Sequence, residues 1–201
     1  ALAQIHITLC QEGSSVWILD ADISGCFDNI AHDPLLEKVP TFRSSIRRWL
    51  KAGTVEMGNY SKTEAGTPQG GVISPLLANI ALDGMERLFG GETRTGRRIP
   101  PADRKGKNRG IQLIRYADDF VVTAPSREIL ETYVIPRLKV FMSERGLKLN
   151  EMKTHIVHRN EGFNFLGFNV RRYNGTLLVQ PQKEKVQQHL REIKTLLDNN
   201  K

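Results

Sequence analysis

The chain has 201 residues, of which 39% are hydrophobic and 25% charged, and its formal net charge is +7 at pH 7. A chain of this length and composition buries a core of its own, which excludes a largely disordered protein. No apolar stretch approaches the roughly 20 residues that span a bilayer, and no signal-peptide pattern opens the chain. We therefore expect no membrane partner and an intracellular protein, cytoplasmic in a prokaryote or organellar, and not secreted.

Residues 14–23, "SSVWILDADI", alternate with the period of a β-strand. Trp17 and Leu19 belong to a face that is apolar throughout, whereas the other face ends in Asp20 and Asp22. The pattern predicts a strand that packs its Trp17 face on helices and carries Asp22 into a cleft at its C-terminal end. Asp20 lies one pleat deeper and is interpreted as a polar neighbour.

Two helices are predicted in the segments that follow. Asp33 followed by Pro34 is typical of a helix start, with an N-cap acceptor and then a proline at the first helical position. Residues 63–89, "TEAGTPQGGVISPLLANIALDGMERLF", predict a glycine-rich loop and then a helix that Ser74 caps and that keeps helical spacing to Leu88.

Residues 90–110, "GGETRTGRRIPPADRKGKNRG", hold seven basic residues against two acids, a net charge of +5. A Gly/Pro-rich basic loop suits contact with nucleic-acid phosphates, because Lys and Arg release condensed counterions. A solvated insertion without a ligand gives the same pattern. The seven basic residues are Arg94, Arg97, Arg98, Arg104, Lys105, Lys107 and Arg109.

Residues 111–122, "IQLIRYADDFVV", predict a hairpin whose turn contains Asp118 and Asp119. Ser126 is the predicted cap of the next helix, which Pro136 kinks and Gly146 ends.

Strands are then predicted in "LKLNEMKTHIVH", "FNFLGFNVRRY" and "TLLVQ", with Asn174-Gly175 as a tight hairpin turn between the last two. A final helix carries Val186, Leu190 and Ile193 on one apolar stripe. The whole order predicts an α+β fold, in which helices back one face of an antiparallel sheet and the other face is free for acids and a ligand.

Three acids share this predicted sheet: Asp22 at a strand end, and Asp118 with Asp119 at a hairpin tip. Acids are common at turns, where they accept bonds from backbone amides, so a structural role is the simpler interpretation of "YADD" alone. Central strands of one sheet would also bring these like charges together, which favours a cation between them. Carboxylates are ligands that Mg²⁺ prefers, and two ions about 4 Å apart serve phosphoryl chemistry.

The segments "DISGCFD", "TPQGGVISPLLANI", "YADD", "GLKLNEMKT" and "FNFLGF" look like successive motifs of one family. In this order and spacing the sequence resembles the reverse transcriptases, in particular the reverse transcriptase/maturase proteins encoded by group II introns. The resemblance covers nearly the whole chain. It implies a polymerase palm with a ferredoxin/RRM-like antiparallel sheet and an RNA-directed DNA polymerase. CRISPR-associated, retron and diversity-generating reverse transcriptases stay open as alternatives.

The resemblance implies that Asp22 and Asp118 ligate two Mg²⁺ ions, with Asp119 assisting and the backbone carbonyl of Ile23 completing one coordination sphere. Mn²⁺ is the expected substitute. One ion would lower the pKa of the primer 3′-hydroxyl, and the other would hold the triphosphate and stabilise the departing pyrophosphate.

The same resemblance assigns four residues to the nucleotide. Phe27 would be the sugar gate that favours dNTPs, Gln69 and Gly70 would contact the nascent base pair, and Lys153 would lie near the pyrophosphate. Without the motifs these positions have plainer interpretations: a core aromatic, a turn and a solvated lysine.

Phe165, Leu166 and Gly167 correspond to the hairpin that grips the primer, although "FLGF" equally suits an apolar core strand. The implied partners are an RNA template, a DNA primer, dNTPs and intron RNA. The sequence does not predict the oligomeric state.

We expect residues 1–182 to form the palm with a remnant of the fingers in the basic insertion at 90–110, and residues 183–201 to lead toward a thumb or maturase domain. Because the family's fingers segment and thumb are expected outside these residues, polymerisation by this chain alone should be weak. Two further hypotheses are a non-catalytic RNA-binding splicing scaffold, which the intact acids disfavour, and an RNA-directed RNA polymerase.

Overall fold

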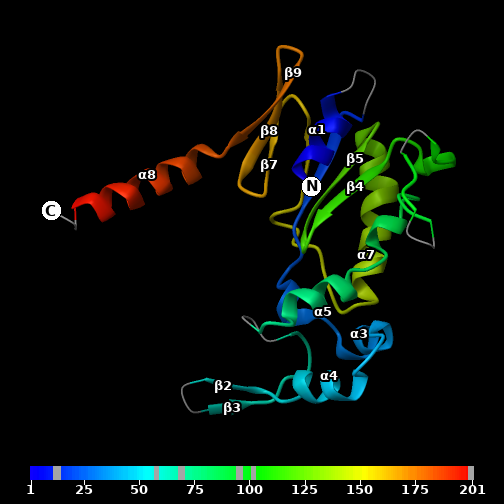
Figure 1. Cartoon of the computed structure of the whole chain (residues 1–201). Helices are drawn as coiled ribbons and strands as arrows, with labels where there is room; N and C mark the ends of the chain where they lie inside the picture. The colour runs from blue at the N-terminus through cyan, green and yellow to red at the C-terminus, as the bar shows by residue number, and fades with distance from the viewer. Residues whose placement is uncertain (11–14, 57–58, 68–70, 94–96, 101–102, 199–201) are drawn as a thin grey trace.

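The computed structural model describes all residues except 11–14, 57–58, 68–70, 94–96, 101–102 and 199–201. Its centre is a four-stranded antiparallel sheet in the order β4-β5-β1-β6 (Figure 1). The strands are β1 (Trp17–Ala21), β4 (Gln112–Tyr116), β5 (Asp119–Ala124) and β6 (His155–His158). β1 therefore lies between β5 and β6, and the predicted α+β class with an antiparallel sheet is confirmed.

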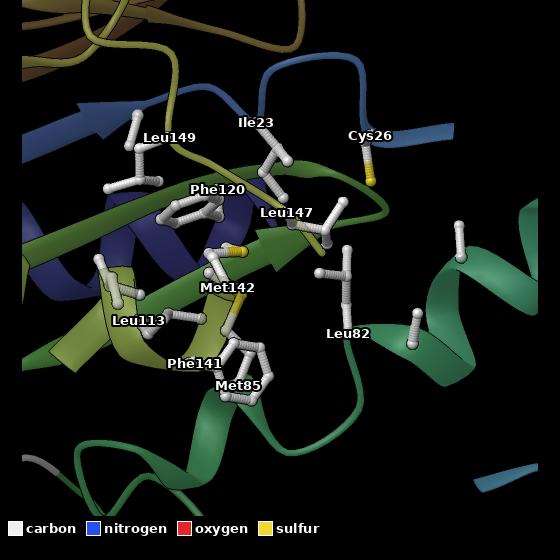
Figure 2. Packing of buried hydrophobic residues seen from close by; sticks show 14 of the residues in the cluster. Ile23, Cys26, Leu82, Met85, Leu113, Phe120, Phe141, Met142, Leu147 and Leu149 are labelled. Carbon is white, nitrogen blue, oxygen red and sulfur yellow. The ribbon is translucent and has the colours of Figure 1, made fainter. Parts of the chain in front are cut away.

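One face of this sheet packs on helices, as the alternation in β1 predicts. Leu19 and Ala21 belong to a core cluster that Leu113 and Phe120 join from the neighbouring strands. Figure 2 shows Phe120 close to Met142 of α7 within this cluster. The elements on this face are α5 (Ser74–Ala81), the 3-10 turn η1 (Met85–Arg87), α6 (Arg127–Ile129), the π-helical turn η4 (Leu130–Val134) and α7 (Ile135–Ser143).

The opposite face is covered along most of its length, so the prediction of a free face was wrong. Ile18, Ile114 and Val121 point into a second apolar cluster with Ile5 and Leu9 of the N-terminal helix. These side chains need cover because they are apolar. At the acid-bearing end of the face Asp22 is half-buried and Asp119 is exposed. The covering elements are α1 (Leu2–Cys10) and a sheet of β7 (Phe163–Phe165), β8 (Phe168–Tyr173) and β9 (Thr176–Pro181).

Two predicted helix boundaries differ from the structure. α3 (His32–Lys38) has Ala31 at its N-cap, so Asp33, the predicted cap, lies in the first turn and Pro34 is not the first helical residue. α5 begins at Ser74 after Ile73 and ends at Ala81. Gly84 adopts φ 92 and stops the helix short of Leu88, because helical φ is negative.

The helix after the β4–β5 hairpin follows the prediction more closely. Ser126 caps it, with its Oγ accepting a hydrogen bond from the Ile129 amide. A π-helical turn precedes Pro136, which lies in the first turn of α7, so the expected distortion takes the form of a wider turn. Gly146 follows with φ 74, and a Cβ there would lie 2.8 Å from the Asn29 carbonyl oxygen.

The strand that ends at residue 158, the C-terminal helix and the smaller elements complete the fold. The strand expected in residues 147–158 shortens to β6, and Leu149 forms only an isolated bridge with Ile23. α8 projects away from the rest of the molecule (Figure 1), and its apolar stripe is exposed. The remaining elements are α2 (Cys26–Asn29), α4 (Arg43–Leu50), β2 (Thr54–Glu56), β3 (Asn59–Ser61), η3 (Gly106–Asn108) and α8 (Lys183–Asp198).

Candidate active site

The structure brings the three acids to one end of the central sheet. Asp22 directly follows β1, and the pairing of Tyr116 with Asp119 leaves Ala117 and Asp118 as a two-residue turn between β4 and β5. Ala117 adopts φ 54, a left-handed conformation that a turn this short requires. The β1–β5 register ends at Ala21 opposite Phe120, and one further residue sets Asp22 across from Asp119.

The acids at this end of the sheet affect one another electrostatically. Burial raises the pKa of Asp119 above its ordinary value, and the charges of Asp118 and Asp22 raise it further. Burial also raises the pKa of Asp20 to about 6, with Asp119 and Asp22 adding to the rise and His155 opposing it. The open end of the sheet is therefore a concentration of negative charge, which a bound cation would relieve.

Two side chains from the loop before β6 reach Asp22. The Asn150 side-chain amide donates to Asp22 Oδ2 at 3.2 Å, and the Asn150 backbone amide donates to the Asp22 carbonyl oxygen at 2.8 Å. Lys153 Nζ lies 3.6 Å from the same Oδ2, with 68% of its side chain exposed. Asn150 thus orients the carboxylate, while Lys153 supplies a mobile countercharge. Sequence reasoning missed Asn150, although it lies within the quoted "LNEMKT" segment.

The oxygen atoms at this end suit a hard divalent cation. Within the described ranges no group of three or more His, Cys, Asp and Glu side chains is arranged to hold an ion. The oxygen atoms available at this end are those of the Asp22, Asp118 and Asp119 carboxylates and of the Ile23 main chain. In the Ile23–Leu149 bridge, Asp22 O accepts from Asn150 and Ser24 N donates to the Lys148 carbonyl. The Ile23 carbonyl between them must point the other way, toward the β5 side where the acids lie.

Arg115 supports the acidic turn by a hydrogen bond to its backbone, a role that the sequence analysis did not predict. Its side chain is only 12% exposed and forms an ion pair with Glu86 at 2.7 Å. It also donates to Asn79 Oδ1 at 3.0 Å and to the Ala117 carbonyl oxygen at 2.9 Å. One guanidinium thus ties α5 and η1 to the turn. The available signal was an arginine directly after the apolar run "LI" of a buried strand.

The loop assigned to the nucleotide docks beside Phe27. The Thr67 amide donates to the Phe27 carbonyl at 2.6 Å, and the Gly66 amide donates to the Ile30 carbonyl at 2.8 Å. Gly66 has φ 84, and a Cβ there would lie 2.5 Å from the Asp28 carbonyl oxygen, so glycine permits this contact. The Phe27 ring is half-buried against the main core. Gln69 and Gly70 lie outside the described residues.

The predicted primer-grip residues form a hairpin turn on the covered face of the sheet. Phe165 pairs with Phe168, and Leu166 and Gly167 form the turn with φ 50 and 80. Phe165 is 4% exposed in the second apolar cluster, so its role in the fold is that of a core residue. The Gly167 carbonyl accepts from the Gln182 amide at 3.0 Å, which fixes the turn.

The basic region divides into a structural part and an exposed part, and the assignment of Arg104 to nucleic acid was wrong. Arg104 is 5% exposed and donates to the carbonyls of Phe89, Ile99 and Ile111. Arg104 therefore stabilises the fold of the loop, because a buried guanidinium needs several hydrogen-bond acceptors. Arg94 and the Lys107 side chain lie outside the described residues. The exposed basic residues are Arg97, Arg98, Lys105 and Arg109.

Known proteins resemble both the sequence and the fold. Residues 2–170 match the family described as reverse transcriptase (RNA-dependent DNA polymerase). The group II intron-encoded protein LtrA of Lactococcus lactis is 30% identical over 82% of this chain and 37% of its own length. Protein YkfC of Escherichia coli is 30% identical over 82% of this chain and 49% of its own length. The chain thus spans less than half of these relatives.

Solved structures show the same fold at lower identity. Apo telomerase from Candida tropicalis matches with a TM-score of 0.63 at 14% identity, over 90% of this chain and 35% of that one.

The described part of the chain contains no helix both long and apolar enough to cross a membrane.

Proposed function

Because the chain belongs to the reverse transcriptase (RNA-dependent DNA polymerase) family, we propose that it forms the palm of an RNA-directed DNA polymerase. The reaction adds a dNTP to a primer 3′-hydroxyl. The observation that carries the proposal is the meeting of Asp22 with the Asp118–Asp119 turn at the open end of the sheet. A turn of two acids beside a third acid fits nucleotidyl transfer better than a purely structural hairpin.

In this proposal Asp22 and Asp118 hold two Mg²⁺ ions, with Asp119 and the Ile23 carbonyl as further oxygen donors. Such ions, when bound, activate the primer hydroxyl and neutralise the departing pyrophosphate. The chain itself positions the carboxylates that would hold these ions. The β1–β5 ladder fixes the spacing of the acids, and the Asn150 amide holds the Asp22 carboxylate in one orientation.

Two further side chains would act on the nucleotide. Lys153 lies beside Asp22 on an exposed stem, so it can turn from this carboxylate to an incoming triphosphate. Phe27 follows Asp22 by five residues and its carbonyl accepts a hydrogen bond from the Thr67 amide; we assign its ring to the exclusion of a 2′-hydroxyl. Gln69 and Gly70 follow Thr67 in sequence, and we assign them to the nascent base pair.

Template and primer would approach from the two sides of this end. We assign the exposed Arg97, Arg98, Lys105 and Arg109 to template phosphates and the Leu166–Gly167 turn to the primer strand. The likeness to LtrA supports a group II intron origin with intron RNA as an additional partner.

Asp118→Asn tests the proposed function. In a single-nucleotide addition assay on an RNA template with a DNA primer, the parent chain should add dGTP in a Mg²⁺-dependent reaction and should add GTP far more slowly. Asp118→Asn should lower the rate more than about 100-fold, because even residues that only support metal ligands cost about 10–100-fold. RNA binding should persist.

Asp103→Asn is the matched control, since it removes an equal charge from an exposed position in the basic region. It should keep the parent rate. Retained addition in Asp118→Asn would end the two-metal assignment, and equal use of dGTP and GTP would point to an RNA-synthesising enzyme.

A further inference from the structure

We propose that a cavity at the other end of the sheet binds the phosphodiester backbone of a nucleic-acid strand, at a site separate from the acids. The cavity has a volume of about 710 Å³. None of the described residues that line it is acidic. We call it the arginine cavity, and its polar lining residues are Arg159, Asn160, Arg171, Arg172, Tyr173 and Asn174.

The arginine cavity lies far from the proposed active site. The Arg159 amide donates to the carbonyl of Val16, which precedes β1, and the Arg172 amide donates to the Arg159 carbonyl. Asp22 follows the other end of β1. Six residues of extended chain separate Val16 from Asp22, a distance of about 20 Å at the usual rise of a strand. The two sites therefore occupy opposite ends of the same strand.

The arginine cavity is preformed. Arg171 Nε donates to the Asn160 carbonyl at 2.9 Å, and Arg172 Nε donates to the Gly175 carbonyl at 3.1 Å. In the bonds formed by described residues, both guanidiniums are thus held by Nε, which leaves their terminal Nη donors for a ligand. Asn174 and Gly175 adopt φ 47 and 82, the tight turn that closes β8 onto β9 beside the cavity.

Charge and size favour a nucleic-acid strand as the ligand. Arg171 and Arg172 both line the cavity, and a phosphate group matches the planar fork of a guanidinium. The cavity volume falls within the range of about 300–1,000 Å³ typical of organic ligands, larger than an isolated ion needs. The Tyr173 ring is 58% exposed at its rim and offers a surface on which a base can stack.

The experiment measures how the chain binds a fluorescent single strand of about 12 nucleotides, as RNA and as DNA of the same sequence, across a salt series. EDTA replaces Mg²⁺ and no nucleotide is added, so the result is independent of polymerase activity. Arg171→Gln with Arg172→Gln should weaken binding about 10-fold at low salt. It should also lower the slope of log affinity against log salt by about 1.4, or about 0.7 for each phosphate contact.

Two further variants separate the contribution of charge to strand binding from that of base stacking. Arg171→Lys with Arg172→Lys should restore the salt slope, because both charges return. Tyr173→Ala should weaken binding about 5-fold or more without changing the slope, because it removes only a stacking surface. Circular dichroism melts establish that each variant is folded.

Arg137→Gln with Lys139→Gln is the matched control, since it removes the same charge from α7 on the other face of the sheet. Equal losses in this control and in the Arg171/Arg172 pair would reduce the effect to net charge and overturn the proposal. An unchanged affinity in the pair, or displacement of the strand by about 1 mM inorganic phosphate, would overturn it too. Tighter binding of RNA than of DNA would add a 2′-hydroxyl contact to the site.

Discussion

The two ends of the central sheet carry opposite charges, and they are held in different ways. At the acid end, Asp22, Asp118 and Asp119 are set beside one another by strand register and a turn, against their own repulsion. At the other end, Arg171 and Arg172 are each tied by a hydrogen bond to a carbonyl. The acidic turn is thus held by a hydrogen bond from Arg115, whereas each arginine at the other end is held by a hydrogen bond of its own.

After the loss of Asp118 itself, the largest expected effect on nucleotide addition comes from removing Arg115, which supports the acidic turn. Arg115→Met leaves Glu86 and the Ala117 carbonyl without their shared donor. Nucleotide addition should fall about 10–100-fold, as for residues that orient metal ligands, and unfolding should become easier by about 1–3 kcal/mol. Single-turnover extension and urea melts measure the two effects.

Arg87→Met is its control, because Arg87 forms an exposed ion pair with Asp83 that should contribute less than about 1 kcal/mol. Strand binding at the arginine cavity should not change in either variant. An Arg115→Met chain that extends primers at the parent rate would show that the turn positions its acids without Arg115.

A glycine at the arginine end should matter less for nucleotide addition than Arg115 does, but more for stability. Gly162 has φ 86, and a Cβ there would lie 2.9 Å from the Arg171 Cβ and 3.0 Å from the Val170 carbonyl oxygen. Gly162→Ala should cost about 1–2 kcal/mol of strain and roughly 1–3 kcal/mol more for the clash. It should also loosen strand binding while leaving nucleotide addition unchanged.

Gly175→Ala separates strain from the clash, since Gly175 has φ 82 and open space around it. It should show the strain cost alone in urea melts. Equal costs for the two variants would mean that the close approach of Gly162 to β8 does not stabilise this end.

The smallest effect is a difference in cysteine reactivity at the acid end. Burial, and then the charge of Asp118, raises the pKa of the Cys26 thiol from 9.0 to about 12. A raised pKa favours the thiol in the folded state, so its contribution to stability is complete below about pH 9 and is lost as the pH rises through about 12. Iodoacetamide at about pH 8 should label the exposed Cys10 and spare Cys26, as read by mass spectrometry. Comparable labelling would show that the acid end is open to solvent.

Local signals predicted the parts of the structure that are decided within a few residues. The alternation around Trp17, the cap at Ser126 and the Asn174-Gly175 turn are all present. The cap predicted at Asp33 is at Ala31, two residues earlier, because several residues near a helix start can take the capping position. The helix predicted to reach Leu88 ends at Ala81, seven residues earlier, before Gly84 with its positive φ.

Contacts between distant segments escaped prediction for a different reason. The cover over Ile18 comes from α1 and from β7–β9, which lie on either side of it in the sequence. Arg104 is basic and sits in a polar loop, so nothing local distinguishes it from its exposed neighbours. Arg115 likewise shows its role only through partners on α5 and η1.

The sequence by itself determined the strand that ends in Asp22, the hairpin that presents Asp118 and Asp119, and the order of motifs that marks the family. These depend on side-chain period, turn chemistry and residue identity, all of which are local. Only the tertiary structure decided where the sheet is covered and where the charges gather. Register places Asp22 opposite Asp119. The Arg172 amide donates to the Arg159 carbonyl and the Arg159 amide to the Val16 carbonyl, which joins the β8–β9 hairpin to the far end of β1. Such pairings depend on burial and hydrogen bonding between segments far apart in the chain, which no single segment specifies.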